Sequence, residues 1–444
     1  MKSTDDYLKF LSFPSISANP EHAKDMSDCC HWLKSFLDEI GLQTELWNEE
    51  GRATIFASDL RAGEDKPTLL LYTHYDVQPA DPLDLWDSPP FEPRIENGEV
   101  YARGAQDNKG QCWYVLQALK QLLEEGALPV NIKLIIDGEE EIGSFALHEL
   151  LPKKKEELSA DYLAIVDLGM PSKDTPAITL GTRGVASLDL EVECAKRDLH
   201  SGTHGGIVNN PIQILVELLA SAKDEKGRIL VPGFYDGLIP LSEKDSARIS
   251  YDFDLKEYEA LVGTTATGGE SDYSPLERSW LRPTLEINGV TGGYSGDGIK
   301  TVIPARASAK VSCRLVPGQD PADILEKVCR FFESQSKDGV KVKATAHQGC
   351  GAAVRTSTES QVVQAFASAY EKVFDKPCAF IYEGASIPIA YELQKASEAE
   401  IVLVGLGLID DCIHAPNEHF GLDRIEKGKE IIMDAIKNLG NASI

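Results

Sequence analysis

Histidine and carboxylate residues follow three short apolar segments of the sequence directly and a fourth within a few residues. The segments are residues 68–73, 131–136, 162–166 and 401–406. Runs of this length and composition are typical of strands buried on both faces. The groups that follow them are His74 with Asp76, Asp137 with Glu139–Glu141, Asp167, and Asp410 and Asp411 with His414. Ligands of open α/β sheets bind beyond the carboxyl ends of the strands, so we expect these groups to gather at one sheet edge.

This set of side chains is suited to a pair of divalent metal ions. Imidazole and carboxylate ligands suit zinc, cobalt or manganese. Two ions only about 3.5–4 Å apart need a carboxylate that contacts both. Asp107, at the start of the helical pattern of residues 108–125, adds a further carboxylate to the set. A carboxylate that binds neither ion would serve as the base for a metal-activated water.

Each residue also has a plainer interpretation when taken alone. A histidine at a strand end, such as His74, is usually a hydrogen-bonded surface residue. Asp76 could cap a turn, and Asp107 could be the N-cap of the helix that follows it. Glu139–Glu141 could form a solvated acidic loop, and His200 could be an ordinary loop residue. Four apolar segments that each end in a metal-competent group are hard to obtain by chance, so the joint pattern favours the metal site.

The elements that must position these residues change in character along the chain. In the first third, apolar strands alternate with helical patterns, which predicts a mixed, mostly parallel sheet with helices on both faces. The middle of the chain carries alternating apolar and polar residues at 185–193, 307–315 and 340–346. Such alternation is typical of half-exposed antiparallel strands. The last ninety residues again combine an apolar strand with helical patterns, and helices are expected at residues 359–374 and 424–439.

We therefore predict one α/β domain that is interrupted by a smaller α+β domain. The predicted α/β domain comprises residues 1–182 and 353–444, and the inserted domain comprises residues 183–352. The segment of residues 223–282 is polar, Gly-rich and weakly periodic. We place it in the inserted domain, and the sequence assigns it no chemical role.

Composition excludes several classes of partner. The 444 residues include 44 basic and 71 acidic side chains, a formal net charge of −27. Such a surface repels phosphate backbones and anionic lipids, so neither nucleic acid nor a membrane is expected as a partner. No segment approaches the ~20 apolar residues of a membrane span, and residues 1–14 lack the layout of a secretion signal. The nine cysteines have no framework spacing, which indicates reduced thiols and predicts a cytoplasmic location.

Taken in order, these motifs resemble the M20 metallopeptidase family, and within it the cytosolic nonspecific dipeptidases and carnosinase-like enzymes. The resemblance covers most of the chain, from His74 to Glu418. It is carried by His-x-Asp, Asp-x-Lys-Gly, Glu-Glu-x-Gly-Ser, a further Asp and a distant His. A single motif of this kind is weak, whereas the ordered set is specific.

The resemblance implies a site with two divalent metal ions per subunit, zinc or else manganese or cobalt. Asp107 would be the carboxylate that contacts both ions, and Glu140 would be the general base. Asp76 would hold the ring of His74 in place. Where the family usually has a second Asp, this chain has Asn108, at a position that is not a ligand. The implied metal ligands are His74, Asp107, Glu141, Asp167 and His414.

The inserted domain resembles the lid and dimerisation domain of the family. The segment around His200 would reach into the active site of the partner subunit in a homodimer and stabilise an oxyanion there. Arg314 would grip the C-terminal carboxylate of the substrate, and Thr301 would form a hydrogen bond nearby. Ser386 would lie near the same carboxylate and Glu383 near the substrate amine. Without the resemblance, a surface salt bridge is the plainer interpretation of Arg314.

The predicted function is metal-dependent hydrolysis of dipeptides or short peptides with a free C-terminal carboxylate. An alternative with the same metal site is the removal of acyl groups from N-acyl amino acids, of the acetylornithine or succinyl-diaminopimelate type. The segments 223–282 and 295–304 favour the dipeptidase branch. A non-catalytic binding protein is a third alternative, but every implied ligand and the base are present. The Gly-x-Ser-x-Gly elbow of a serine hydrolase and the P-loop of a nucleotide-binding protein are both missing.

Overall fold

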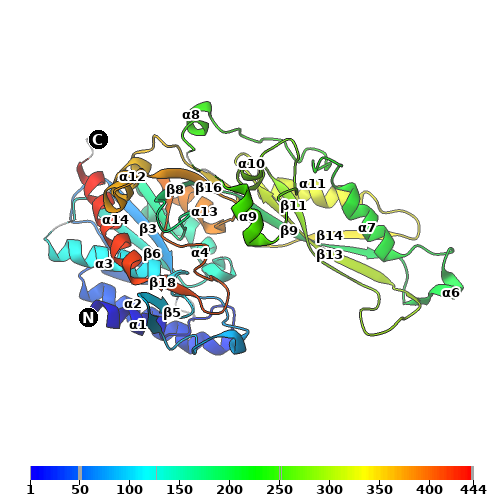
Figure 1. Cartoon of the computed structure of the whole chain (residues 1–444), viewed down its shortest axis with the longest axis horizontal. Helices are drawn as coiled ribbons and strands as arrows, with labels where there is room; N and C mark the ends of the chain where they lie inside the picture. Colours follow the sequence, from blue (N-terminus) through cyan, green and yellow to red (C-terminus); the bar gives the residue numbers. More distant parts are fainter. Residues whose placement is uncertain (1, 49–52, 127, 250, 252, 442–444) are drawn as a thin grey trace.

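The computed structural model shows an elongated molecule with two separate large sheets (Figure 1). It describes residues 2–48, 53–126, 128–249, 251 and 253–441. The N-terminal and C-terminal parts of the chain build the larger sheet, and the middle of the chain builds the smaller one. The predicted mixed α/β fold with an inserted α+β domain is confirmed. Among the described residues, no helix combines the length and apolar character that crossing a membrane requires.

Nine strands form the larger sheet, in the order β1-β2-β6-β3-β7-β17-β8-β15, with β16 paired to β8. Its centre, from β6 to β17, is parallel, and antiparallel strands flank it. The strands are β1 (Gln43–Trp47), β2 (Thr54–Asp59), β3 (Thr68–His74), β6 (Asn131–Asp137), β7 (Tyr162–Val166), β8 (Ala177–Thr182), β15 (Val354–Arg355), β16 (Ala379–Glu383) and β17 (Glu400–Val404).

Both faces of this sheet are buried, which explains its apolar strands. In β3, Leu69 and Leu71 face one hydrophobic core, while Leu70 and Tyr72 face another on the opposite side. The helices of the first core are α1 (Lys2–Leu11), α2 (Ala23–Glu39), α3 (Lys109–Glu124), α12 (Gln361–Phe374) and α14 (Leu422–Asn441). Those of the second core are α4 (Phe145–Leu150), α5 (Lys155–Leu158) and α13 (Pro388–Ser397).

The smaller sheet is antiparallel, in the order β11-β13-β9-β14. Its strands alternate buried and partly exposed residues, and the buried set, which includes Leu188 and Leu190, packs against two helices. Asp320 caps the helix that begins at Pro321, by accepting the backbone N–H groups of Ala322 and Asp323. The elements are β9 (Gly184–Glu193), β11 (Thr284–Gly292), β13 (Arg306–Leu315), β14 (Lys341–Ala346), α7 (Pro211–Ser221) and α11 (Pro321–Glu333).

Short strands complete the fold. β10 (Leu199–His200) pairs with β12 (Val302–Ile303), next to α6 (Ser201–His204). β18 (His419–Gly421), β5 (Glu99–Tyr101) and β4 (Arg94–Glu96) form a separate small sheet.

The chain passes between the two large sheets at two places. Arg183 is the one residue between β8 and β9, and residues 347–353 connect β14 to β15. We propose that the domains divide at the boundaries predicted from the sequence, 182/183 and 352/353, because both boundaries lie at these crossings.

The segment of residues 223–282 touches both parts of the molecule. It contains three short helices, α8 (Glu243–Ser246), α9 (Leu255–Val262) and α10 (Pro275–Trp280). Ile249 forms a parallel bridge with Phe380 of β16, and Asp245 accepts the backbone N–H of Thr358. The segment therefore runs from the inserted domain back to the edge of the larger sheet (Figure 1).

Candidate metal centre

The carboxyl ends of parallel strands bring the predicted residues to one edge of the larger sheet. His74 is the last residue of β3 and lies in register with Asp137, the last residue of β6. Asp167 directly follows β7. Asp107 enters from the loop before α3, and His414 enters from the loop between β17 and β18.

Two groups of side chains are arranged to hold a metal ion, and Asp107 belongs to both. His74, Asp107 and Asp167 form one group, and Asp107, Glu141 and His414 form the other. The candidate ligand atoms of each group lie within 4.8 Å of one another. Asp107 Oδ1 lies 3.2 Å from His74 Nε2, and Asp107 Oδ2 lies 2.9 Å from His414 Nε2. One carboxylate thus faces both groups, as sharing between two ions requires.

The donor atoms of this centre fit divalent metal ions. His74 is fully buried, and neither its Nε2 nor Glu141 Oε1 has a hydrogen-bond partner within the described part of the chain. Buried polar atoms are rarely left unpaired. His74 Nδ1 lies 3.1 Å from the backbone oxygen of Asp76 and 3.3 Å from its carboxylate. This favours the tautomer protonated at Nδ1, which leaves Nε2 as a ligand. Nitrogen and carboxylate donors suit zinc, manganese or cobalt.

The electrostatics of the centre also favour cations. Burial by itself would raise the pKa of Asp107, but His414 and His74 outweigh it and hold this pKa below its usual value. Burial and the charge of Asp107 raise the pKa of Glu141 to about 7. Hydrogen bonds to Asp107 and Glu141 raise the pKa of His414 to about 10. Carboxylates outnumber imidazoles in both groups, and divalent cations would offset this negative charge.

Glu140 lies next to the metal groups but belongs to neither. It begins a short 3-10 turn (Glu140–Ile142), and the carboxylate of Asp76 accepts the backbone N–H groups of Glu140 and Glu141. Gly143 ends the turn with a φ of +98°, a conformation that favours glycine. Burial raises the pKa of the Glu140 side chain well above its usual value. A carboxylate held here, outside both groups, is placed to accept a proton.

Glu418 is fully buried and holds the loop that carries Asp107. Its carboxylate accepts the backbone N–H groups of Gly104, Gln106 and Asp107 and a hydrogen bond from the Arg103 guanidinium. Glu418 is not among the site residues predicted from the sequence. The available signal was its position at the end of the motif that contains the last predicted metal ligand.

Three of the predicted substrate residues lie close together. Arg314 Nη1 donates to Ser386 Oγ at 2.7 Å, and the Glu383 carboxylate accepts the backbone N–H of Ala385 in the same loop. Arg314 forms no salt bridge with any residue that the structure describes. Among the described residues, Arg314 therefore has no ion-pair partner, and its plainer interpretation as a surface ion pair is wrong.

His200 and Thr301 lie together but away from Arg314 of the same chain. Ser201 donates its backbone N–H to Thr301 O, and β10 pairs with β12. Thr301 precedes β12, whereas Arg314 lies near the far end of β13. The label of α6, which follows His200, stands at the end of the molecule opposite the larger sheet (Figure 1). Within one chain, eight of the ten residues of β13 lie between Thr301 and Arg314.

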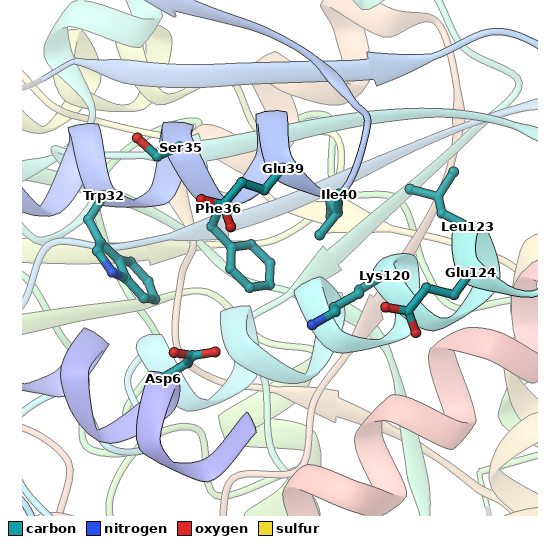
Figure 2. A pocket seen from close by; sticks show the side chains of 9 residues that line it. All are labelled: Asp6, Trp32, Ser35, Phe36, Glu39, Ile40, Lys120, Leu123 and Glu124. Atoms are coloured by element: carbon teal, nitrogen blue, oxygen red, sulfur yellow. The ribbon is translucent and has the colours of Figure 1, made fainter. Parts of the chain in front are cut away.

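A pocket of about 440 Å³ lies elsewhere, between α1, α2 and α3 (Figure 2). The rings of Trp32 and Phe36 and the side chain of Lys120 point into it. The other lining residues are Asp6, Ser35, Glu39, Ile40, Leu123 and Glu124. None of them belongs to the metal groups, so this pocket adds nothing to the site.

Comparisons with known proteins agree with this geometry. Residues 70–438 match the family model described as Peptidase family M20/M25/M40. The chain belongs to this peptidase family. The human Beta-Ala-His dipeptidase is 37% identical over 372 residues, which cover 82% of this chain and 73% of the relative. The Cys-Gly metallodipeptidase dug1 of Schizosaccharomyces pombe is 29% identical over 465 residues, which cover 100% of this chain and 97% of the relative.

A solved structure of the same family has the same fold over the full length. It is an M20 family metallo-carboxypeptidase from Sulfolobus solfataricus, 33% identical, with a TM-score of 0.90 and full coverage of both chains. The M20 chain is therefore a hydrolase of peptide bonds with a catalytic domain and an inserted domain.

Proposed function

We propose that this M20 peptidase is a dipeptidase that uses two divalent metal ions and requires a free C-terminal carboxylate on its substrate. The observation that carries the proposal is the Asp107 carboxylate, whose two oxygens face two separate groups of metal-competent side chains. The names of the human and yeast relatives, a Beta-Ala-His dipeptidase and a Cys-Gly metallodipeptidase, support dipeptides as the substrate class.

The metal ligands follow from the two groups. His74 and Asp167 would hold one ion, Glu141 and His414 would hold the other, and Asp107 would contact both. When bound, the ions would supply a water of lowered pKa and polarise the peptide carbonyl. Zinc fits these donors, and manganese and cobalt fit them as well.

Glu140 performs the proton transfers. It accepts a proton from the attacking water and returns that proton to the leaving amine. Asp76 positions both the base and a metal ligand. Its carboxylate accepts the backbone N–H of Glu140, and its backbone oxygen orients the ring of His74.

The substrate carboxylate is bound by Arg314 together with Ser386. A planar guanidinium matches a planar carboxylate, and the 2.7 Å hydrogen bond to Ser386 fixes its orientation. Glu383, three residues before Ser386, would lie near the substrate amine.

The partner subunit of a homodimer completes the site. The separation of His200 and Thr301 from Arg314 within one chain supports this arrangement, because these residues would meet the substrate only from a second copy. His200 would then donate to the developing oxyanion. We also propose a cytoplasmic location, supported by the nine cysteines, which are all free.

The test compares three substrates for the metal-reconstituted protein: an L-L dipeptide, its C-terminal amide and an N-acetyl amino acid. We expect the free dipeptide to be cleaved far faster than the amide or the N-acetyl compound, and its cleavage to be lost on addition of a chelator. Preferred cleavage of the N-acetyl compound would overturn the dipeptidase proposal, and equal cleavage of the amide would overturn the role of Arg314.

A further inference from the structure

Arg183 stands where the chain passes from the larger sheet to the smaller one. It is the one residue between β8 and β9, and its side chain is half-buried. It belongs neither to the metal groups nor to the substrate residues predicted from the sequence.

Arg183 holds the loop that carries Ser386 at two adjacent carbonyls. Its backbone N–H donates to Ala385 O at 3.1 Å, and its guanidinium Nε donates to Gly384 O at 2.9 Å. One of these bonds depends on the side chain, and a charged donor makes it a strong one.

The same guanidinium reaches the segment 223–282. Its Nη1 donates to Arg282 O at 3.4 Å. Gly384 is packed against this segment, because a Cβ there would lie 2.8 Å from Ser279 Oγ and 3.0 Å from Ser279 O. The loop is therefore enclosed between the side chain of Arg183 and the end of α10.

Arg282, the residue of this segment that Arg183 contacts, is held by its own side-chain interactions. The guanidinium of Arg282 donates to both carboxylate oxygens of Glu270, at 2.5 and 3.0 Å. It also lies over the rings of Tyr235 and Tyr273, 5.3 and 4.3 Å from their centroids. These cation–π contacts and charged hydrogen bonds hold Arg282, the residue whose carbonyl oxygen accepts from Arg183.

Arg183 also lies near Arg314. β13 pairs with β9 so that Arg314 is opposite Val185, two residues after Arg183. Burial, and next the charge of Arg314, lower the pKa of Arg183 to about 10. Two guanidinium groups this close favour an anionic ligand beside them.

We propose that Arg183 is a positioning residue for the carboxylate end of the substrate. It fixes the loop of residues 384–386 against α10 and thereby keeps Ser386 within reach of Arg314. The inference rests on the proposed function, in which Arg314 and Ser386 bind the C-terminal carboxylate. It also gives the segment 223–282 a role, as the support of that loop.

The experiment measures kcat and KM for a dipeptide and for its C-terminal amide in Arg183→Met, Arg183→Lys and Arg314→Met. We expect Arg183→Met to raise KM for the dipeptide about tenfold, the cost of a lost charged hydrogen bond, with kcat within about twofold. The kinetics of the amide should stay unchanged. Arg183→Lys should recover only part of the loss, since an ammonium lacks the fork of donors.

Arg278→Met is the matched control. Arg278 lies on α10 as well, but its guanidinium donates to the backbone oxygens of Ala266 and Gly268 and not to the loop. We expect this variant to match the unmodified protein for both substrates.

The outcomes separate the inference from the proposed function. If Arg183→Met keeps the preference for the dipeptide over the amide while Arg314→Met loses it, the inference is overturned and the carboxylate site stands. If Arg314→Met also keeps the preference, the carboxylate site itself is overturned. If Arg183→Met does not fold, Gly384→Ala tests the same loop, because its Cβ presses on Ser279; an unchanged preference in that variant would overturn the inference.

Discussion

Asp107 is the residue on which the metal centre depends, and its position depends in turn on buried neighbours. The N-cap interpretation of Asp107 is wrong, because Asn108 occupies the N-cap position of α3. The carboxylate of Asp107 instead faces His74 and His414, while Glu418 holds its backbone. The side chain is thus free to contact two ions and not to cap a helix.

Replacing Glu140, the proposed base, should remove catalysis and leave metal binding intact. Glu140→Gln should lower kcat by about 10³-fold, the usual contribution of a general acid–base residue. Two metal ions per chain should remain, because Glu140 belongs to neither metal group. Steady-state kinetics and elemental analysis of the same preparation check both points. Near-normal turnover would refute the assignment of the base.

Replacing Glu418 should weaken metal binding, although it belongs to neither metal group. Glu418→Gln loses an oxygen that accepts backbone N–H groups of the loop that carries Asp107. We therefore expect the affinity for the metal ions to fall about 10- to 100-fold, the usual effect of replacing a residue that orients metal ligands. Competition with a chromophoric chelator measures it. Glu426→Gln, an exposed residue paired with Lys429, is the control and should bind metal normally. Equal affinity in the two variants would contradict the role of Glu418.

The sequence predicted the candidate ligands because each follows an apolar strand or belongs to an ordered motif. His74 and Asp167 needed only the rule that parallel strands end at one edge. Glu418 and Arg183 were missed since their contacts depend on loops that are distant in sequence. The role of Thr301 near the substrate carboxylate stays a prediction; sequence order alone does not reveal that most of β13 separates it from Arg314 within one chain.

At the scale of elements, hydrophobic pattern accounts for most of the fold. The wholly apolar β3 and β6 are buried on both faces, and the alternating β9 is buried on one. The pattern did not predict the return of the segment 223–282 to the edge strand β16. That contact rests on an isolated backbone bridge between Ile249 and Phe380, which has no periodic signal in the sequence.

Asp137, the last residue of β6, should make the free energy of unfolding depend on pH. Burial, and next the charge of Asp76, raise the pKa of Asp137 to about 6, against roughly 3.9 in an unfolded chain. The folded state therefore binds the proton more tightly, and this stabilisation, full below about pH 4, is lost as pH rises through 6. Asp137 accepts hydrogen bonds from Ser144 and Tyr72 that asparagine retains in part.

Asp137→Asn removes this dependence. Between about pH 4 and pH 7, the free energy of unfolding of the variant relative to the unmodified protein should shift by up to about 3 kcal/mol in favour of the variant. Urea titrations of the metal-free protein across this range measure the difference. A difference that stays constant with pH would contradict the raised pKa.

At the scale of the whole molecule, α6, which directly follows His200, lies at one end of the elongated shape, and β3 and β6, whose ends carry the metal centre, lie towards the other (Figure 1). A symmetric dimer would bring the His200 segment of one subunit to the centre of the other, and each site would then need both chains.

Mixing two inactive variants tests this arrangement. Glu140→Gln subunits supply an intact His200, and His200→Ala subunits supply an intact Glu140. Each mixed dimer would contain one complete site, so random exchange should restore roughly a quarter of the normal activity. Activity after denaturation and refolding of an equal mixture measures the effect. No recovery, in a mixture shown to contain mixed dimers, would mean that His200 does not act across subunits.

The most direct test is a titration of the metal-free protein with zinc or manganese, in which bound metal and dipeptide hydrolysis are measured together. We predict no hydrolysis without metal and a maximum rate at two ions per chain, with Asp107→Asn unable to reach that state because both groups share this carboxylate. Full hydrolysis in the metal-free protein, or an unchanged titration of Asp107→Asn, would contradict the two-metal site.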